Sequence, residues 1–227
     1  MIKLEKPLAK YIDHTILNNH ASKEEFLKVI NECKEYDFAM IAINSAPVAF
    51  CKSHLKETDV HVGAAIGFPL GQTTTKVKVY ETIQAIEEGA DEIDYVINLC
   101  DVKDKKFDQV QKEMENIVSI CKAHSVLCKV IFENCYLEEE EIIQLCNIAS
   151  IVKPDFIKTS TGFGEFGATL EHVALMRKHT SLDVGIKAAG GIRDFETAYA
   201  MIQAGATRIG TSSGIKIINE YLSLNQL

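Results

Sequence analysis

The chain alternates short β-branched runs with longer amphipathic segments, and this alternation constrains its fold more than any other feature. Successive runs begin 23 to 36 residues apart, which is enough for a strand, a helix and two loops. No linker, low-complexity tract or sharp change of composition divides the sequence. The strand candidates are YIDHT, FAMIAIN, HVGAAIG, EIDYVIN, CKVIFEN, DFIKTS, DVGIKAA and TRIGTS, which begin at Tyr11, Phe38, His61, Glu92, Cys128, Asp155, Asp183 and Thr207.

The segments between these runs carry helix signals. Between residues 73 and 89, Val79, Ile83 and Ile86 follow helical spacing, with threonine hydroxyls before them and a glycine after them. The acidic run Glu138–Glu141 is expected to open another helix, because negative charge suits a helix N-terminus. Each strand candidate is therefore followed by a segment able to cross back over a sheet.

Eight strand-helix units without insertions predict an α/β protein, a single-domain (β/α)8 TIM barrel covering residues 1–227. A doubly wound open sheet is the structural alternative. That fold usually carries a glycine-rich phosphate loop after its first strand, and YIDHTIL contains no glycine. The closed barrel is therefore favoured.

Composition narrows the partners. The hydrophobic fraction of 47% is ample for a core, and the net charge of −8 disfavours nucleic acid or an anionic membrane as the main partner. A small anionic substrate stays compatible, because a local site can be positive on an acidic protein. The opening MIKLEKPLAKYIDH lacks the apolar core of a signal peptide, and no run suits a membrane span, so we expect a cytoplasmic protein.

The cysteines and histidines do not form a metal-ligand pattern. The seven cysteines include no CxxC pair and are expected to be reduced thiols, and the seven histidines include no HExxH motif. His14 stands beside Asp13, which is compatible with a metal site or a catalytic dyad. A hydrogen-bonded structural histidine is the favoured explanation. We therefore expect no metal and no cofactor.

Side-chain parity directs charge toward the barrel centre. Along each strand alternate residues share a face, and this places Lys158, Lys187, Lys129 and Asp94 on the inner side. Barrel interiors normally fill with branched apolar side chains. A structural ion-pair network is one explanation. Because buried charge is costly unless paired and apolar residues would serve stability as well, two lysines and an aspartate on nearby strands favour catalysis.

These residue types suit Schiff-base chemistry on an aldehyde or ketone. A lysine amine is nucleophilic only when deprotonated, so its pKa must fall by burial or a cationic neighbour. Lys187 would supply that neighbour for Lys158, and a carboxylate such as Asp94 would move protons directly or through a water.

Two glycine-bearing segments follow the last two strands, AAGGIR at 188–193 and RIGTSSG at 208–214. Barrels often bind phosphate with these two loops, through backbone amides and a helix N-terminus. Ordinary turn glycines and N-cap serines would explain either loop alone. Their joint placement favours a phosphate site.

Several segments together resemble the deoxyribose-phosphate aldolase family. The match runs in the expected order from about Tyr11 to Gly214. KTSTGF followed by K-x-x-GG-I-R is highly specific, whereas GADEID alone would be a weak signal. The matching segments are YIDHTIL, IGFPLG, GADEIDYVIN, KVIFENCYL, IKTSTGF and IKAAGGIR.

The resemblance implies a metal-independent class I aldolase that reversibly splits 2-deoxy-D-ribose 5-phosphate into acetaldehyde and D-glyceraldehyde 3-phosphate. Carried over by motif, Lys158 is the Schiff-base lysine, Lys187 tunes its pKa and Asp94 joins the proton relay. The resemblance also counts two residues with the substrate-binding ones. They are Asp13, which would lie near Lys187, and Lys129, which would help to order the charged interior. The positions matching the phosphate end are Gly162, Gly190, Gly191, Gly210, Ser212 and Ser213.

Other readings stay open at this point. Another Schiff-base barrel aldolase, acting on a ketose bisphosphate or as a transaldolase, is the nearest rival, although a bisphosphate would need a second phosphate site and one is found. A catalytically silent phosphosugar-binding barrel would not need Lys158, Lys187 and Asp94.

The expected partners are small phosphosugar and aldehyde substrates. Barrels of this kind commonly associate as homodimers or higher homo-oligomers, but no stripe in the sequence identifies an interface.

Overall fold

The computed structural model describes residues 4–225, and its centre is a closed barrel of eight parallel strands. Each strand pairs with the next one along the chain, and β8 closes the barrel on β1. This closure confirms the barrel and excludes the open sheet. The strands are β1 Ile12–Thr15, β2 Met40–Asn44, β3 His61–Ile66, β4 Glu92–Val96, β5 Leu127–Ile131, β6 Phe156–Lys158, β7 Gly185–Ala189 and β8 Arg208–Thr211.

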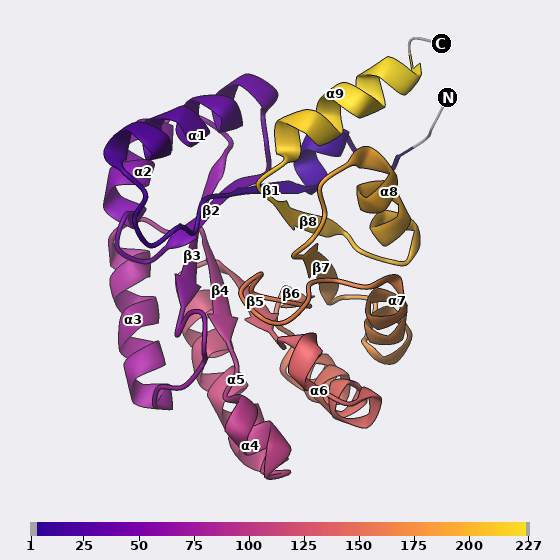
Figure 1. Cartoon of the computed structure of the whole chain (residues 1–227). Helices are drawn as coiled ribbons and strands as arrows, with labels where there is room; N and C mark the ends of the chain where they lie inside the picture. The colour runs from indigo at the N-terminus through magenta and orange to yellow at the C-terminus, as the bar shows by residue number, and fades with distance from the viewer. Residues whose placement is uncertain (1–3, 226–227) are drawn as a thin grey trace.

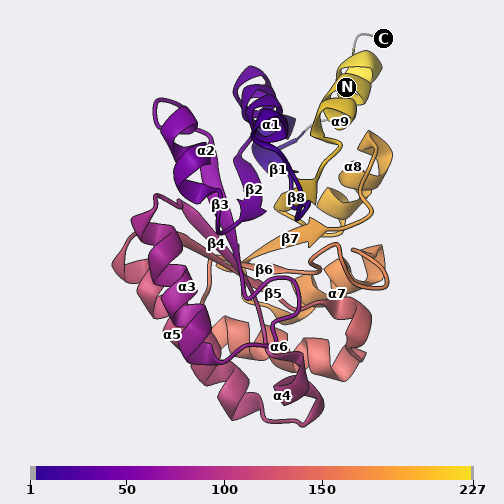
Figure 2. The ribbon, with the colours of Figure 1, turned by 60° about the vertical axis from the view of Figure 1, so that its left-hand side comes forward.

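Helices surround the strands as an outer ring (Figure 1), and the view in Figure 2 shows α1, α8 and α9 together on one side of it. Short 3-10 turns η1, Leu8–Tyr11, and η2, Asn134–Tyr136, complete the chain path. The helices are α1 Lys23–Tyr36, α2 Val48–Leu55, α3 Thr75–Glu87, α4 Leu99–Lys103, α5 Phe107–Ala123, α6 Glu139–Val152, α7 Leu170–His179, α8 Phe195–Gln203 and α9 Gly214–Asn225.

The apolar core lies between the strands and the helix ring. Ile41, Ile93, Val130, Ile157 and Ile186 alternate along their strands with the inward residues and are wholly buried in this layer. This burial removes apolar surface from water and is the main favourable term for folding. The barrel centre, in contrast, is free to hold polar side chains.

Local signals place the predicted helices correctly. Thr74 caps α3 by accepting the amide hydrogen of Val77, and the chain leaves that helix through Gly89 at a φ of +103°. Glu138 and Glu141 form a reciprocal capping box at the start of α6.

In residues 4–225 no helix is both long and apolar enough to cross a membrane. The predicted domain of residues 1–227 also includes 1–3 and 226–227, which lie outside the described residues. Because all strands run in parallel, the loops after β6, β7 and β8 meet at one end of the barrel.

Candidate active site

Asp94 lies at the meeting point of three lysines inside the barrel. Its Oδ1 accepts from Lys129 Nζ at 2.7 Å, and its Oδ2 accepts from Lys187 Nζ at 2.7 Å and from Lys158 Nζ at 3.1 Å. All four side chains are buried, between 0% and 4% exposed. The structure thus brings together the residues that parity directed inward, and Asp94 contacts both predicted catalytic lysines.

Below them lies a second layer of charge. Asp13 contacts Lys187 Nζ at 2.5 Å and Arg208 at 2.5 Å, and Arg208 also donates to Glu92 at 3.1 Å. Glu92 in turn contacts Lys129. Sequence reasoning gave no role to Glu92 and missed Arg208. Arg208 shares the strand parity of Gly210, and that parity was a signal for it.

Seven residues therefore form one continuous set of ion pairs, here called the interior network: Asp13, Glu92, Asp94, Lys129, Lys158, Lys187 and Arg208. The network holds four basic residues and three acidic ones. If all seven are ionised, one positive charge is in excess. If one amine is neutral, the charges balance.

Lys158 is the amine in the interior network whose pKa is lowered, and it is therefore the one that can lose a proton and balance the charges. Burial lowers the pKa of Lys158, and the ammonium group of Lys187 lowers it further, against the opposing effect of Asp94. The result is a fall from 10.5 to about 8. An appreciable fraction of Lys158 is thus a neutral amine near neutral pH, the form that attacks a carbonyl group.

The partners of Lys158 are held in their charged forms. Burial alone would raise the pKa of Asp94, but Lys129, Lys187 and Lys158 hold it well below its usual range. Burial would lower the pKa of Lys129, but Asp94 and Glu92 raise it above its usual value. Lys129 is thereby kept as an ammonium group, and Asp94 as a carboxylate.

An open pocket of about 1520 Å³ begins at the two lysines. Lys158 and Lys187 line its inner end, whereas Asp13, Asp94 and Lys129 lie beneath it and do not line it. From there the pocket extends between α1 and α9, which Figures 1 and 2 show in neighbouring places in the helix ring. A substrate that enters through this pocket therefore reaches Lys158 and Lys187 before the other residues of the interior network.

The predicted phosphate residues all line this pocket. They come from the loop after β6, the loop after β7, strand β8 itself, which holds Gly210, and the loop after β8. Gly191 has a φ of +79°, which a larger residue adopts only under strain. At Gly210 a Cβ would lie 3.1 Å from Lys187 Cε, so glycine allows the lysine stem to pass. The pocket residues concerned are Gly162, Gly190, Gly191, Gly210, Ser212 and Ser213.

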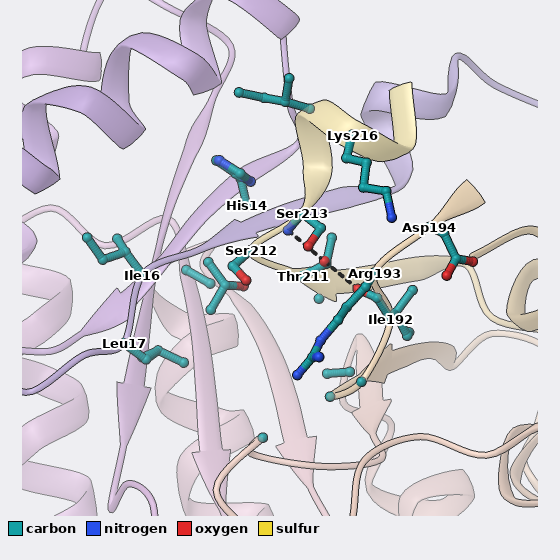
Figure 3. A pocket seen from close by; sticks show the side chains of 18 of the residues that line it. His14, Ile16, Leu17, Ile192, Arg193, Asp194, Thr211, Ser212, Ser213 and Lys216 are labelled. Carbon is teal, nitrogen blue, oxygen red and sulfur yellow. Dashed lines mark hydrogen bonds between the residues drawn. The ribbon is translucent and has the colours of Figure 1, made fainter. Parts of the chain in front are cut away.

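Thr211 ties the last two loops together. Its Oγ1 donates to the carbonyl oxygen of Ile192 at 2.6 Å and accepts the amide hydrogen of Ser213 at 2.9 Å (Figure 3). Because that amide is occupied, Ser213 would reach a ligand through its hydroxyl group. Thr211 was not predicted as a site residue; its signal was a third hydroxyl directly before the two serines.

Sequence reasoning also missed two basic residues of the pocket, Arg193 and Lys216. In Figure 3 the side chain of Arg193 extends away from Lys216 and Asp194. Lys216 pairs with Glu220 at 3.5 Å. Arg193 belongs to the segment AAGGIR, so a cation directly after the glycine pair was visible in the sequence.

Glu133 fixes the loop that follows Lys158. Its carboxylate accepts the amide hydrogen of Thr161 at 3.0 Å and also contacts the Thr161 hydroxyl group, which accepts the amide hydrogen of Phe163 at 3.0 Å. These bonds hold Gly162 at the rim of the pocket.

His14 does not form a dyad with Asp13. Its Nε2 lies 2.8 Å from Glu32 Oε2, and Asp13 points to the other face of β1 and contacts Lys187 and Arg208. The prediction of a hydrogen-bonded histidine matches this arrangement.

Comparison with known proteins agrees with the geometry. A family model described as DeoC/LacD family aldolase matches residues 8–220. The deoxyribose-phosphate aldolase of Bacteroides thetaiotaomicron is 52% identical over 219 residues, 96% of this chain and 92% of that protein. That of Thermococcus gammatolerans is 50% identical over 213 residues, 93% of this chain and 95% of that protein.

Solved structures are similar over nearly the whole length. One, described as QR15, an aldolase, is 42% identical with a TM-score of 0.90, covering 96% of this chain and 97% of that one. A deoxyribose phosphate aldolase from Aeropyrum pernix, described as tetrameric, is 31% identical with a TM-score of 0.89, covering 96% of this chain and 92% of that one.

Proposed function

Because the chain belongs to the DeoC/LacD aldolase family, we propose that it is a deoxyribose-phosphate aldolase that works through a Schiff base on Lys158. The reaction is the reversible cleavage of 2-deoxy-D-ribose 5-phosphate into acetaldehyde and D-glyceraldehyde 3-phosphate. The names of two relatives, 52% and 50% identical to this chain, support 2-deoxy-D-ribose 5-phosphate as the substrate.

The observation that carries the mechanism is the placement of Lys158 at the inner end of the pocket, 3.1 Å from Asp94 and with its pKa lowered to about 8. Its neutral amine adds to the aldehyde carbon of the open-chain sugar, and loss of water gives the protonated imine. The imine draws electrons from the neighbouring carbon bond. The bond between the second and third sugar carbons then breaks as the third-carbon hydroxyl loses its proton.

Cleavage releases D-glyceraldehyde 3-phosphate and leaves an enamine on Lys158. Protonation of the enamine carbon and hydrolysis release acetaldehyde and regenerate the amine. Asp94, which contacts the amines of Lys158 and Lys187, is the group proposed to move these protons, directly or through a water. The positive charge of Lys187 beside Lys158 lowers the pKa of Lys158 and so favours its neutral form.

The loops after β6, β7 and β8 are proposed to hold the substrate phosphate at the open end of the pocket. Backbone amides around Gly162, Gly190 and Gly191 and the hydroxyl groups of Ser212 and Ser213 suit an anion. Asp13 and Lys129 support the site from below by holding Lys187 and Asp94 in place.

The chain is also proposed to act as one barrel domain and to form a homo-oligomer. The tetramer described for the Aeropyrum pernix aldolase supports association. Light scattering on the purified protein measures the number of subunits.

Borohydride trapping tests the function directly. With acetaldehyde and borohydride, Lys158 should gain one ethyl group, located by peptide mass mapping, and lose activity in parallel. Lys78 serves as an internal control, because it is equally buried but pairs with Glu113 at 2.8 Å outside the pocket. Modification mainly at Lys187, or an active enzyme that gains no mass, would refute the assignment. A silent sugar-binding barrel would neither gain mass nor cleave the substrate.

A further inference from the structure

One histidine outside the interior network contacts it at the end of the barrel opposite the pocket. His61 is the first residue of β3, at the end of the barrel opposite the pocket, and its Nδ1 lies 2.7 Å from Glu92 Oε1. Its side chain is 46% exposed, whereas that of Glu92 is wholly buried. His61 therefore connects the interior network to solvent at the end of the barrel opposite the pocket.

We propose that His61 is a positioning residue for the reaction, which acts by its charge, through Glu92 and the interior network, on the neutral fraction of the Lys158 amine at the far end of the barrel. This inference rests on the proposed Schiff-base role of Lys158. It extends the active centre along the barrel axis to a histidine that no part of the substrate touches.

Contacts link the two ends without a break. Glu92 contacts Lys129, and Lys129 contacts Asp94 at 2.7 Å. Asp94 then contacts Lys158 at 3.1 Å. Charges in this interior are poorly screened by water. A change of charge at one end therefore alters the electrostatic energy of groups farther away than it would on the surface.

His61 is accessible to protons from solvent. It lines a shallow pocket at its end of the barrel with Lys52, Asp91 and His124. The hydrogen bond to Glu92 raises the pKa of His61, burial opposes this effect, Asp91 adds to it and Arg208 opposes it. His61 is thus a solvent-accessible histidine whose pKa lies above its ordinary value and whose charge responds to the pH of the solvent.

The other charges of this pocket are already compensated. Lys52 Nζ pairs with both carboxylate oxygens of Asp91 at 2.6 and 2.8 Å. His124 directs Nδ1 to the carbonyl oxygen of Ile120 at 2.9 Å, and no hydrogen bond or ion pair in the described part of the chain joins it to Glu92. Of the titratable groups that line this pocket, His61 is the one that contacts a residue of the interior network, Glu92.

The sign of the effect follows from the charge count. The interior network already holds one positive charge in excess when Lys158 is protonated. A proton on His61 adds a further positive charge, which favours loss of the Lys158 proton. As the pH falls, His61 becomes charged and preserves part of the neutral amine that acidification would otherwise remove.

Competitive acetylation of the lysines with acetic anhydride, followed by peptide mass mapping, measures the neutral fraction of Lys158 without any substrate. In His61→Gln, which keeps a hydrogen-bond donor but no charge, labelling of Lys158 below about pH 6.5 should be about threefold lower than in the parent. The difference should close at a pH high enough to deprotonate the parent histidine. The acid side of the kcat/KM profile should move in parallel.

His61→Arg gives the opposite control, because its charge is permanent. Its Lys158 labelling should equal that of the parent at low pH and exceed it once the pH is high enough to deprotonate the parent histidine. His124→Gln removes a histidine from the same pocket without touching the network, and should leave the profile unchanged.

Coincident Lys158 labelling profiles for the parent, His61→Gln and His61→Arg would overturn the inference, even in an active aldolase. An equal shift in His124→Gln would also overturn it, because any nearby charge would then suffice. Failure of the proposed function has a different signature: no borohydride adduct at Lys158 in the parent, whatever the labelling shows.

Discussion

Lys158 and Lys187 differ in what surrounds them, although both stand inside the barrel on neighbouring strands. Lys187 contacts two carboxylates, Asp13 at 2.5 Å and Asp94 at 2.7 Å. Among residues 4–225, Lys158 pairs with one carboxylate, that of Asp94, at the longer distance of 3.1 Å. The better-paired lysine is the one suited to keep its charge, and the other is the one suited to lose its proton.

Replacing Lys187 with Leu should therefore move the acid-side limb of the kcat/KM profile to higher pH. Loss of the neighbouring positive charge raises the pKa of Lys158, which lies at about 8 in the parent. Turnover at pH 7 should fall at least tenfold, and raising the pH should recover part of it.

Lys187→Arg is the matched control, because it returns a positive charge to the same site and should retain the parent limb. Near-normal turnover in Lys187→Leu with an unshifted profile would mean that Lys187 serves structure alone. Circular dichroism of both variants checks that the barrel is intact.

At the scale of elements, the site depends on how two loops are joined. The Thr211 hydroxyl bridges the end of β8 to Ile192, which follows β7, and this bond spans the proposed phosphate site. Thr211→Val keeps the shape of the side chain and removes the bridge.

In Thr211→Val we expect KM for 2-deoxyribose 5-phosphate to rise about tenfold with kcat changed less than twofold. The KM for unphosphorylated deoxyribose should stay the same, because that substrate lacks the phosphate. Thr211→Ser, which keeps the hydroxyl group, should behave like the parent. Equal losses on both sugars would show that the loops do not read phosphate.

The strand pattern made much of this predictable. All eight runs became strands whose starts lie within two residues of the expected ones, because β-branched runs flanked by turn residues leave few other choices. Parity then directed Asp94, Lys129, Lys158 and Lys187 inward, which depends only on alternation along each strand. Closure into a barrel brought them into contact.

What sequence could not supply is pairing across the barrel. Arg208 contacts Asp13 and Glu92, which are 195 and 116 residues away, and nothing local marks those partners. The link between Glu92 and His61 joins β4 to β3 through side chains at the strand ends, and likewise has no motif. Such contacts follow from the stagger of the closed sheet, which the sequence pattern does not specify.

For the whole molecule, the charged barrel centre predicts how stability responds to acid. The folded-state pKa values of Glu92 and Asp94 lie below their unfolded values of 4.5 and 3.8. Their contribution to stability is therefore fully present above about pH 5 and is lost as the pH falls through the unfolded values toward the folded ones.

Glu92→Gln should test this linkage. At pH 7 it leaves Lys129 and Arg208 partly uncompensated and should lower the free energy of unfolding by about 3–5 kcal/mol. Below about pH 4.5 Glu92 takes up a proton in the unfolded parent but resists protonation in the folded one. The stabilising effect of the charge therefore shrinks as the pH falls, and the stabilities of parent and variant, measured by urea unfolding, should converge. Curves that stay parallel from pH 7 to pH 3 would contradict the role assigned to Glu92.

The charged centre also guards the chain against mispaired strands during folding. If β4 slipped by one residue against its neighbours, Glu92 and Asp94 would turn into the apolar layer beneath the helices, and Ile93 would enter the barrel centre. The carboxylates would be buried without partners, which is far more costly than misplacing one apolar side chain for another. In a barrel filled with valine and isoleucine, competing strand alignments differ little in energy. Here each inward charge raises the energy of every alignment that would leave it without its partner, so the native alignment of its strand is favoured.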